Sequence, residues 1–73
     1  MKRLDDFNLS RSQWNALINE WIIGKNAERD RALLRRRLFD GICFEELAEE
    51  FDLSTTQAKT IVYESMNRII KHL

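Results

Sequence analysis

Residues 41–70, GICFEELAEEFDLSTTQAKTIVYESMNRII, contain the pattern that decides the fold. Apolar residues at helical spacing predict a short acidic helix at residues 44–51 and, after a brief turn, a longer helix at residues 54–71. Ser54 and Gln57 have the spacing of a capping box, which marks the start of the longer helix. Two helices joined by so short a turn predict a helix-turn-helix, whose second helix can enter the major groove of DNA.

The longer helix separates into an apolar and a polar side at about 100° per residue. The residues on the apolar side, expected to face the core, are Ala58, Ile61, Val62, Ser65, Met66 and Ile69. The polar side and the N-terminal tip supply the candidate DNA-binding residues Thr55, Thr56, Gln57, Lys59, Thr60 and Tyr63, with Asn67 on the same arc. Threonine methyl groups can touch thymine, lysine can bond guanine or phosphate, and tyrosine can bond phosphate. The alternative is an ordinary solvated helix face, which has the same composition.

The chain from about residue 33 to residue 69 resembles a known family. The matching runs are LRRRLFDG at residues 34–41, FEELAEEF at residues 44–51 and Leu53-Ser54. They are similar to region 4 of bacterial primary sigma factors and to the small sigma-like regulators that phages and prophages encode. The resemblance implies DNA binding, promoter recognition in full sigma factors, and contact with RNA polymerase.

Several positions depart from the family pattern. Recognition helices of the family carry Arg and Glu early on, where this chain has Thr55, Thr56 and Gln57. Arg36 stands in place of a leucine and Cys43 in place of a Ser or Thr cap. These departures bear on which DNA sequence is read.

The formal net charge is zero, from 12 basic and 12 acidic residues, which counts against strong non-specific binding to nucleic acid. The charges are nevertheless segregated. Residues 25–40 hold six basic and three acidic residues, residues 41–53 hold five acidic and no basic ones, and residues 54–73 hold three basic and one acidic. Arg35 and Arg37 are candidates for added contacts to the DNA backbone, and a solvated helix face is the alternative.

The first half of the chain is expected to supply two more helices. Ser10 and Gln13 form a second capping box and predict a helix at residues 10–23. A helix at residues 26–40, capped by Asn26, should follow. The apolar positions are Trp14, Leu17, Ile18, Trp21 and Ile22 in the first helix and Ala27, Leu34 and Leu38 in the second. We expect both tryptophans to belong to the core, with stacking on bases or on a partner protein as the alternative.

These elements predict an all-α, compact four-helix domain at residues 10–73, preceded by an arm at residues 1–9, with the helix-turn-helix at residues 44–71. No catalytic, cofactor or metal site is expected, because the only histidine is His72 and the only cysteine, Cys43, has no evident base. No run approaches the roughly 18 apolar residues of a membrane span, so no membrane partner is expected. A lone cysteine cannot form an internal disulfide, which fits the cytoplasm.

Two function classes remain open. The first is a DNA-binding transcription regulator of the sigma-region-4-like kind, from a phage, prophage or bacterium, whose partner is double-stranded DNA. The second is a protein-interaction module that binds RNA polymerase, or pairs with a second copy of itself as a homodimer, without specific DNA binding. The acidic residues 45–50 suit the second class, because they would complement a basic groove on the polymerase.

Overall fold

The computed structural model describes residues 9–72, which form four α-helices and no strand. The helices are α1 (Arg11–Trp21), α2 (Ala27–Phe39), α3 (Phe44–Glu50) and α4 (Thr55–Ile70). This confirms the predicted all-α, four-helix domain, although α1 ends two residues before the predicted position. Residues 1–8 of the predicted arm lie outside the described residues.

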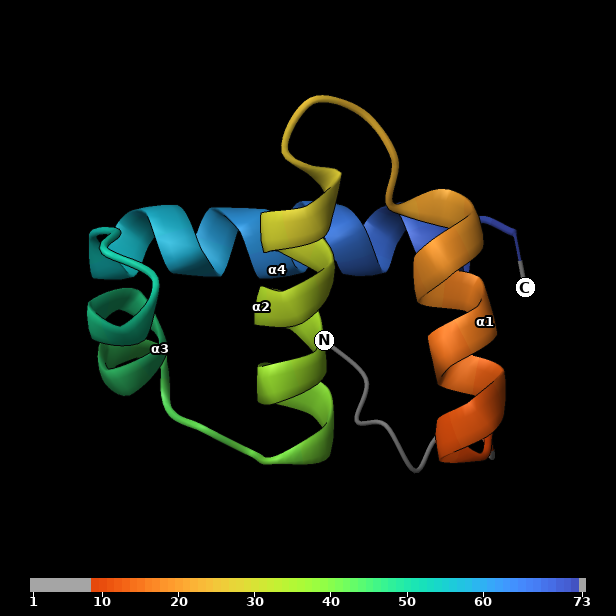
Figure 1. The fold of residues 1–73 in the computed structure, drawn as a ribbon, viewed down its shortest axis with the longest axis horizontal. Helices are drawn as coiled ribbons and strands as arrows, with labels where there is room; N and C mark the ends of the chain where they lie inside the picture. The colour runs from red at the N-terminus through yellow and green to blue at the C-terminus, as the bar shows by residue number, and fades with distance from the viewer. Residues whose placement is uncertain (1–8, 73) are drawn as a thin grey trace.

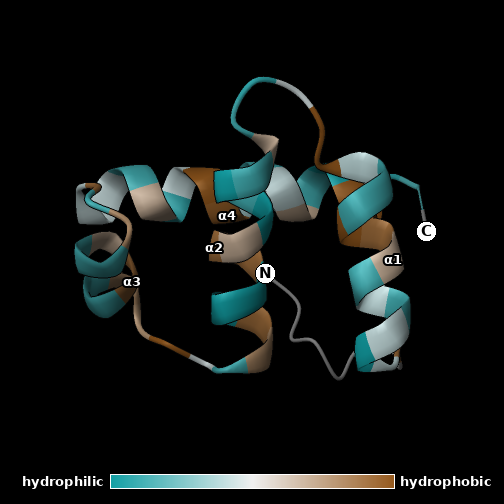
Figure 2. Ribbon diagram, in the orientation of Figure 1, coloured by the Kyte–Doolittle hydropathy of each residue, from teal (hydrophilic) through white to brown (hydrophobic). Residues whose placement is uncertain are grey.

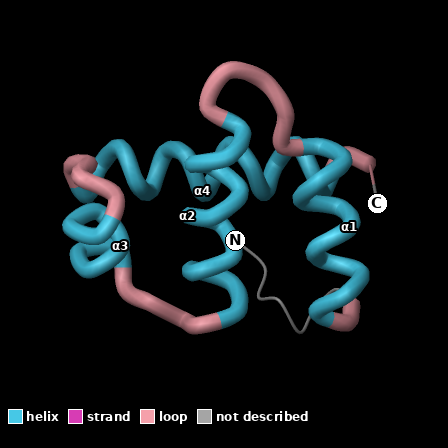
Figure 3. Tube along the Cα trace, in the orientation of Figure 1, coloured by secondary structure: helices cyan, strands magenta, loops and turns pink. Residues whose placement is uncertain are grey.

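The longest helix, α4, is the element on which the other three are assembled. In Figure 1 it runs across the molecule, with α3 at its N-terminal end, α2 across its middle and α1 toward its C-terminal end. Figure 3 shows that the connection from α1 to α2 is an open arch, whereas α3 and α4 are joined by a tight turn. The first half of α4 is therefore held mainly by α3 and α2, and its second half by α1 and α2.

Local hydrogen bonds start α1 and α4 where the sequence predicts. The backbone N–H of Gln13 donates to Ser10 Oγ at 3.1 Å, and the N–H of Ser10 donates to Gln13 Oε1 at 2.8 Å. The same pair of bonds joins Ser54 and Gln57 at 3.1 and 2.9 Å. Both predicted capping boxes are confirmed, and each satisfies backbone N–H groups that a helix leaves without an internal partner.

The other two helices begin without a side-chain cap. The prediction that Asn26 caps α2 is wrong, because its φ of −107° and ψ of 21° are not the extended geometry of a cap. The N–H of Ala27 instead donates to the carbonyl of Gly24 at 3.2 Å, within the connecting arch. Cys43 has the extended geometry at the start of α3, but its thiol makes no capping bond, as expected of a weak acceptor.

The turn between α3 and α4 is closed by a pair of bonds typical of helix ends. The N–H of Leu53 donates to the backbone carbonyl of Ala48 at 2.8 Å, and the N–H of Asp52 donates to the backbone carbonyl of Glu49 at 3.4 Å. These two bonds form a Schellman motif, whose central residue has a left-handed conformation and is usually glycine. Here Asp52 adopts it, with φ of 56°. The chain thus makes this turn without a glycine, at some conformational strain.

All four helices contribute to one apolar core. The buried apolar residues are Trp14, Ile18, Ile22, Leu33, Leu34, Leu47, Ala48, Ala58, Val62, Met66 and Ile69. Several predicted core positions are only half buried at its margin: Leu17, Trp21, Ala27, Leu38 and Ile61. Leu33 was not among the apolar positions predicted for this helix, yet it is buried. The reason is that α2 packs against all three other helices and so buries a wider arc of its surface. Figure 2 shows brown, hydrophobic segments of α4 where α2 crosses it.

Candidate nucleic-acid interface

The candidate DNA-binding residues of α4 lie on its outer side. Four of them, Thr56, Lys59, Thr60 and Tyr63, are exposed within an arc of about 100° and are called the α4 strip below. Tyr63 is 42% exposed, whereas Thr55 at the N-terminal tip is half buried. The opposite side of α4 is fixed in the core. The strip is consequently a polar, solvent-facing surface on a well-anchored helix.

Gln57 is exposed beside the strip, but part of its hydrogen-bonding capacity is already in use. Its side-chain oxygen accepts the backbone N–H of Ser54 at 2.9 Å in the capping box. A side-chain amide also has two N–H donors. These donors are what the predicted Gln57 contact to DNA would have to use.

A shallow groove of about 280 Å³ adjoins the strip on the side of α2. It is lined by Arg29, Leu53, Thr56, Gln57, Thr60 and Ile61. The groove brings Arg29 beside the strip, although that residue was not among the predicted site residues. Arg29 also pairs with Asp30 at 3.0 Å. The position of Arg29 depends on how α2 crosses α4, so the sequence pattern gives no signal for it.

The opposite edge of the strip meets α3 at the ring of Phe44. The guanidinium carbon of Arg37 lies 4.2 Å from the centroid of that ring, and Lys59 Nζ lies 5.8 Å from it. The ring of Tyr63 meets the same ring edge-on, with centroids 5.9 Å apart and an angle of 70°. An N–H of Arg37 also donates to the carbonyl of Ile42 at 2.9 Å. The fold thus brings the predicted residues Arg37, Lys59 and Tyr63 together.

Arg35, by contrast, is directed away from the strip. Its Nε donates to Asn15 Oδ1 at 2.8 Å and one terminal nitrogen donates to Asn19 Oδ1 at 2.6 Å, so it joins α2 to α1. In Figure 1, α1 and α3 lie on opposite sides of α2. The structure therefore does not bring Arg35 together with the other predicted site residues.

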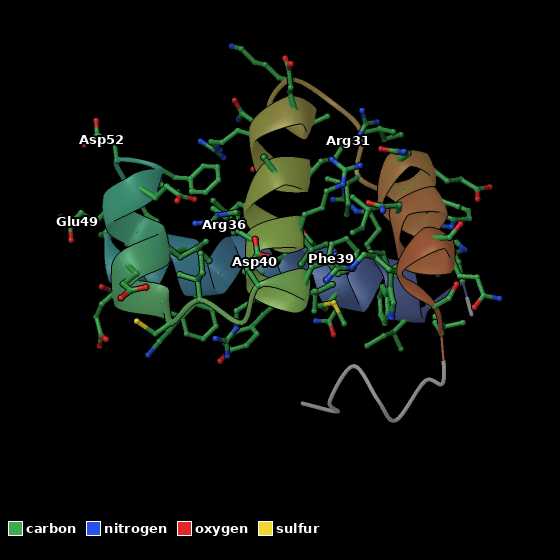
Figure 4. The ribbon with its side chains drawn as sticks, turned by 60° about the horizontal axis from the view of Figure 1, so that its bottom comes forward. Arg31, Arg36, Phe39, Asp40, Glu49 and Asp52 are labelled. Atoms are coloured by element: carbon green, nitrogen blue, oxygen red, sulfur yellow. The ribbon has the colours of Figure 1, made fainter. Side chains whose placement is uncertain are left out.

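Arg31 also bonds to α1. It donates to the carbonyl of Ile22 at 2.7 Å and to that of Asn19 at 3.0 Å. Carbonyl groups at a helix C-terminus lack helical partners, and cations are favourable there. Figure 4 shows Arg31 between α2 and α1. Arg31 therefore acts as a cap for the end of α1.

Arg36 joins α2 to α3 instead. It donates to both carboxylate oxygens of Glu50 at 2.9 and 2.7 Å, and to Asp40 at 2.7 Å. These bonds lower the pKa of Glu50 and raise the pKa of Arg36 itself. Figure 4 shows Arg36 and Asp40 on the side of α2 that faces α3. Here the residue that departs from the family pattern forms an ionic link between helices.

The exposed side of α3 is acidic. Glu46, Glu49 and Glu50 line a shallow hollow of about 450 Å³. This surface would repel phosphate, so it bounds any DNA-binding face. It is also the surface that a basic partner protein would meet.

Sequence expectations also concern four further features: a metal site, a membrane-spanning helix, the cysteine and the histidine. Within residues 9–72, no group of three or more His, Cys, Asp or Glu side chains is arranged to hold a metal ion. In the same range, no helix has the length and apolar character needed to cross a membrane. Cys43 is exposed. The ring of the exposed His72 stacks on Trp21 with centroids 3.5 Å apart, which joins the end of α4 to α1.

Comparison with protein-family models, with curated proteins and with solved structures finds no match to this chain. The resemblance of residues 33–69 to sigma-factor region 4 stays a prediction from the sequence. The case for a function consequently depends on the chemistry and exposure of the α4 strip.

Proposed function

We propose that this protein is a small DNA-binding transcription regulator in which α3, the following turn and α4 act as a helix-turn-helix. The α4 strip is the observation that carries the proposal. Four side chains with suitable chemistry are exposed together on one side of a helix whose other side is buried. An α-helix of about 10–12 Å diameter fits the major groove of B-DNA, which is about 12 Å wide.

Each residue of the strip has a chemical role in the proposal. The methyl groups of Thr56 and Thr60 contact thymine methyl groups, and their hydroxyls bond to base edges. Lys59 and Tyr63 bond to the phosphate backbone. The resemblance of residues 33–69 to sigma region 4 supports a role in bacterial or phage transcription, in the cytoplasm.

The charge distribution sets the expected strength of binding. The net charge is zero, and the acidic surface of α3 lies beside the proposed interface. Few phosphates can then be neutralised, and we expect log K to fall with log [salt] with a slope of roughly −2 to −3. Specific base contacts, rather than non-specific attraction, must supply much of the affinity.

The test begins with selection of bound duplexes from a random pool at two salt concentrations. Lys59→Ala should weaken binding to the selected duplex about tenfold and reduce the magnitude of the salt slope by about one. Lys25→Ala removes the same charge from the arch between α1 and α2 and is the matched control, with binding unchanged. The proposal fails if no sequence is enriched, or if a folded Lys59→Ala variant binds as the wild type does.

The alternative proposal, a protein-interaction module, is favoured by the acidic surface of α3. RNA polymerase recovered from a DNase-treated lysate, with no retention of the protein on duplex DNA, would select it. Charge reversal by Glu46→Lys and Glu49→Lys should then abolish recovery, because the basic partner surface loses its complement. Recovery that is unchanged by this reversal would exclude the acidic surface as the contact.

A further inference from the structure

The ring of Phe44 gathers polar groups from two other helices. Arg37 comes from α2, whereas Lys59 and Tyr63 come from α4. These four residues are called the Phe44 cluster below. The sequence suggested Arg37, Lys59 and Tyr63 as separate DNA contacts and gave Phe44 no role in binding. Their convergence is a property of the fold alone.

The two cations of the cluster are not neutralised by the protein. Neither Arg37 nor Lys59 forms an ion pair with an acidic side chain among residues 9–72. Attraction to the face of an aromatic ring holds a cation in place without cancelling its charge. The cluster therefore keeps two positive charges beside one aromatic ring, 4.2 and 5.8 Å from its centroid, an arrangement that a bound anion would stabilise.

Hydrogen-bond donors also remain in the cluster. Arg37 uses one terminal N–H on the carbonyl of Ile42, and a guanidinium has five N–H donors in all. The ammonium of Lys59 has three donors and the phenol of Tyr63 has one. A tetrahedral anion with several oxygen atoms, such as a phosphate, can accept from donors that two helices place around one ring.

The cluster occupies one edge of the α4 strip. At about 100° per residue, Lys59 lies about 160° around the axis from Gln57, which lines the groove on the other edge. When a helix lies in the major groove, its edges face the sugar-phosphate strands while the middle of its outer side faces the bases. The position of the cluster thus suits a backbone phosphate rather than a base.

We propose that the Phe44 cluster binds a single phosphate of a polynucleotide backbone, held jointly by Arg37 and Lys59, with Phe44 as the positioning residue. This inference rests on the proposed DNA-binding function and adds to it the strand contact at the α3 edge. The hydroxyl of Tyr63 supplies a further donor to the same phosphate. Arg35, which bonds to α1, has no part in it.

A comparison of single and double variants tests whether one phosphate is shared. Arg37→Ala and Lys59→Ala should each weaken duplex binding about fivefold to tenfold and reduce the magnitude of the salt slope by about one. The double variant should also lose only about one in slope, because loss of either residue already releases the phosphate that both hold. A loss of about two would mean separate phosphates and would overturn the shared site. Lys25→Ala again controls for net charge.

The positioning role of Phe44 is tested by substitutions that leave the charge unchanged. Phe44→Leu keeps an apolar side chain but removes the aromatic face, and it should lower duplex affinity and the salt slope while the helical circular dichroism is retained. Phe44→Tyr restores the aromatic face and should bind as the wild type does. If both variants are folded and bind equally, Phe44 has no positioning role.

A small probe separates failure of the site from failure of the proposed function. The thymidine dinucleotide, which has one phosphodiester, should shift the NMR signals of the Arg37 Nε–H and the Phe44 amide but not those of Lys25. These shifts without duplex binding by the wild type would support the phosphate site and overturn the proposed function. Duplex binding without these shifts, and with an unchanged slope in the double variant, would overturn the site alone. Absence of both would overturn both.

Discussion

The two sides of α2 use the same residue type for different purposes. Toward α1, Arg31 and Arg35 donate to neutral carbonyl and amide oxygens and hold two helices together. Toward α3, Arg36 forms ion pairs and Arg37 stacks on Phe44 beside the α4 strip. A basic run along a helix is therefore not one surface. The neighbouring helix decides which arginine stabilises the fold and which is available to a ligand.

The largest effect on stability should come from the side of α2 that faces α1. Arg31→Ala removes two charge-assisted bonds to carbonyl groups and should lower the free energy of unfolding by about 1.5–3 kcal/mol. Urea denaturation measures this change, and Arg68→Ala, at an exposed position of α4, is the control with a change within about 0.5 kcal/mol. Duplex binding by the folded variant should be unaffected. If the Arg31→Ala variant is fully folded but has lost DNA affinity, the distinction between the two sides of α2 is wrong.

A smaller effect of opposite sign is expected in the turn between α3 and α4. Asp52→Gly should raise the free energy of unfolding by about 0.5–1 kcal/mol, because glycine adopts the left-handed conformation without strain. Thermal melting should show this as a rise of about 4–8 °C per kcal/mol. Asp52→Ala removes the same charge but keeps the strain, so it separates the two causes. Equal gains in both variants would mean that charge at the helix C-terminus, not strain, is responsible.

The smallest effect should come from the ion pairs of Arg36, since they are exposed and screened by solvent. Its hydrogen bonds lower the pKa of Glu50 from the usual value of 4.5. A lowered folded-state pKa contributes stability that is fully present above pH 4.5 and is lost as the pH falls through the lowered value.

This pH dependence can be measured by comparing the wild type with Arg36→Met. Denaturant unfolding at neutral pH should show the variant as slightly less stable, and the difference should shrink on acidification or on addition of salt. A difference that is independent of pH would show that packing of the side-chain stem, rather than its charge, joins α2 to α3.

The parts of the fold that the sequence predicts are those with local causes. Ser10 with Gln13, and Ser54 with Gln57, fix the starts of α1 and α4 through bonds between residues three apart. Leu33 was missed because its burial depends on three neighbouring helices rather than on the stripe of one. The left-handed conformation of Asp52 was not predicted, because glycine, the residue that usually adopts it, is absent from this turn.

The candidate site is predictable from the sequence only in part. The exposed residues of the α4 strip follow from helical periodicity, since one side of α4 is apolar. The partners of the arginines do not, because Arg35 and Arg36 contact side chains 14–20 residues away. Such contacts depend on how the helices cross. The Phe44 cluster and the nearness of Arg29 to the α4 strip also depend on how the helices cross.

The central claim is that the outer side of α4 contacts duplex DNA. Amide chemical-shift mapping by NMR, with a duplex selected from the random pool added to the labelled protein, tests it most directly. We expect the largest shifts at Thr56, Lys59, Thr60 and Tyr63, with small shifts throughout α1. Shifts concentrated on the acidic side of α3 or on α1, or no shifts at all, would contradict the claim.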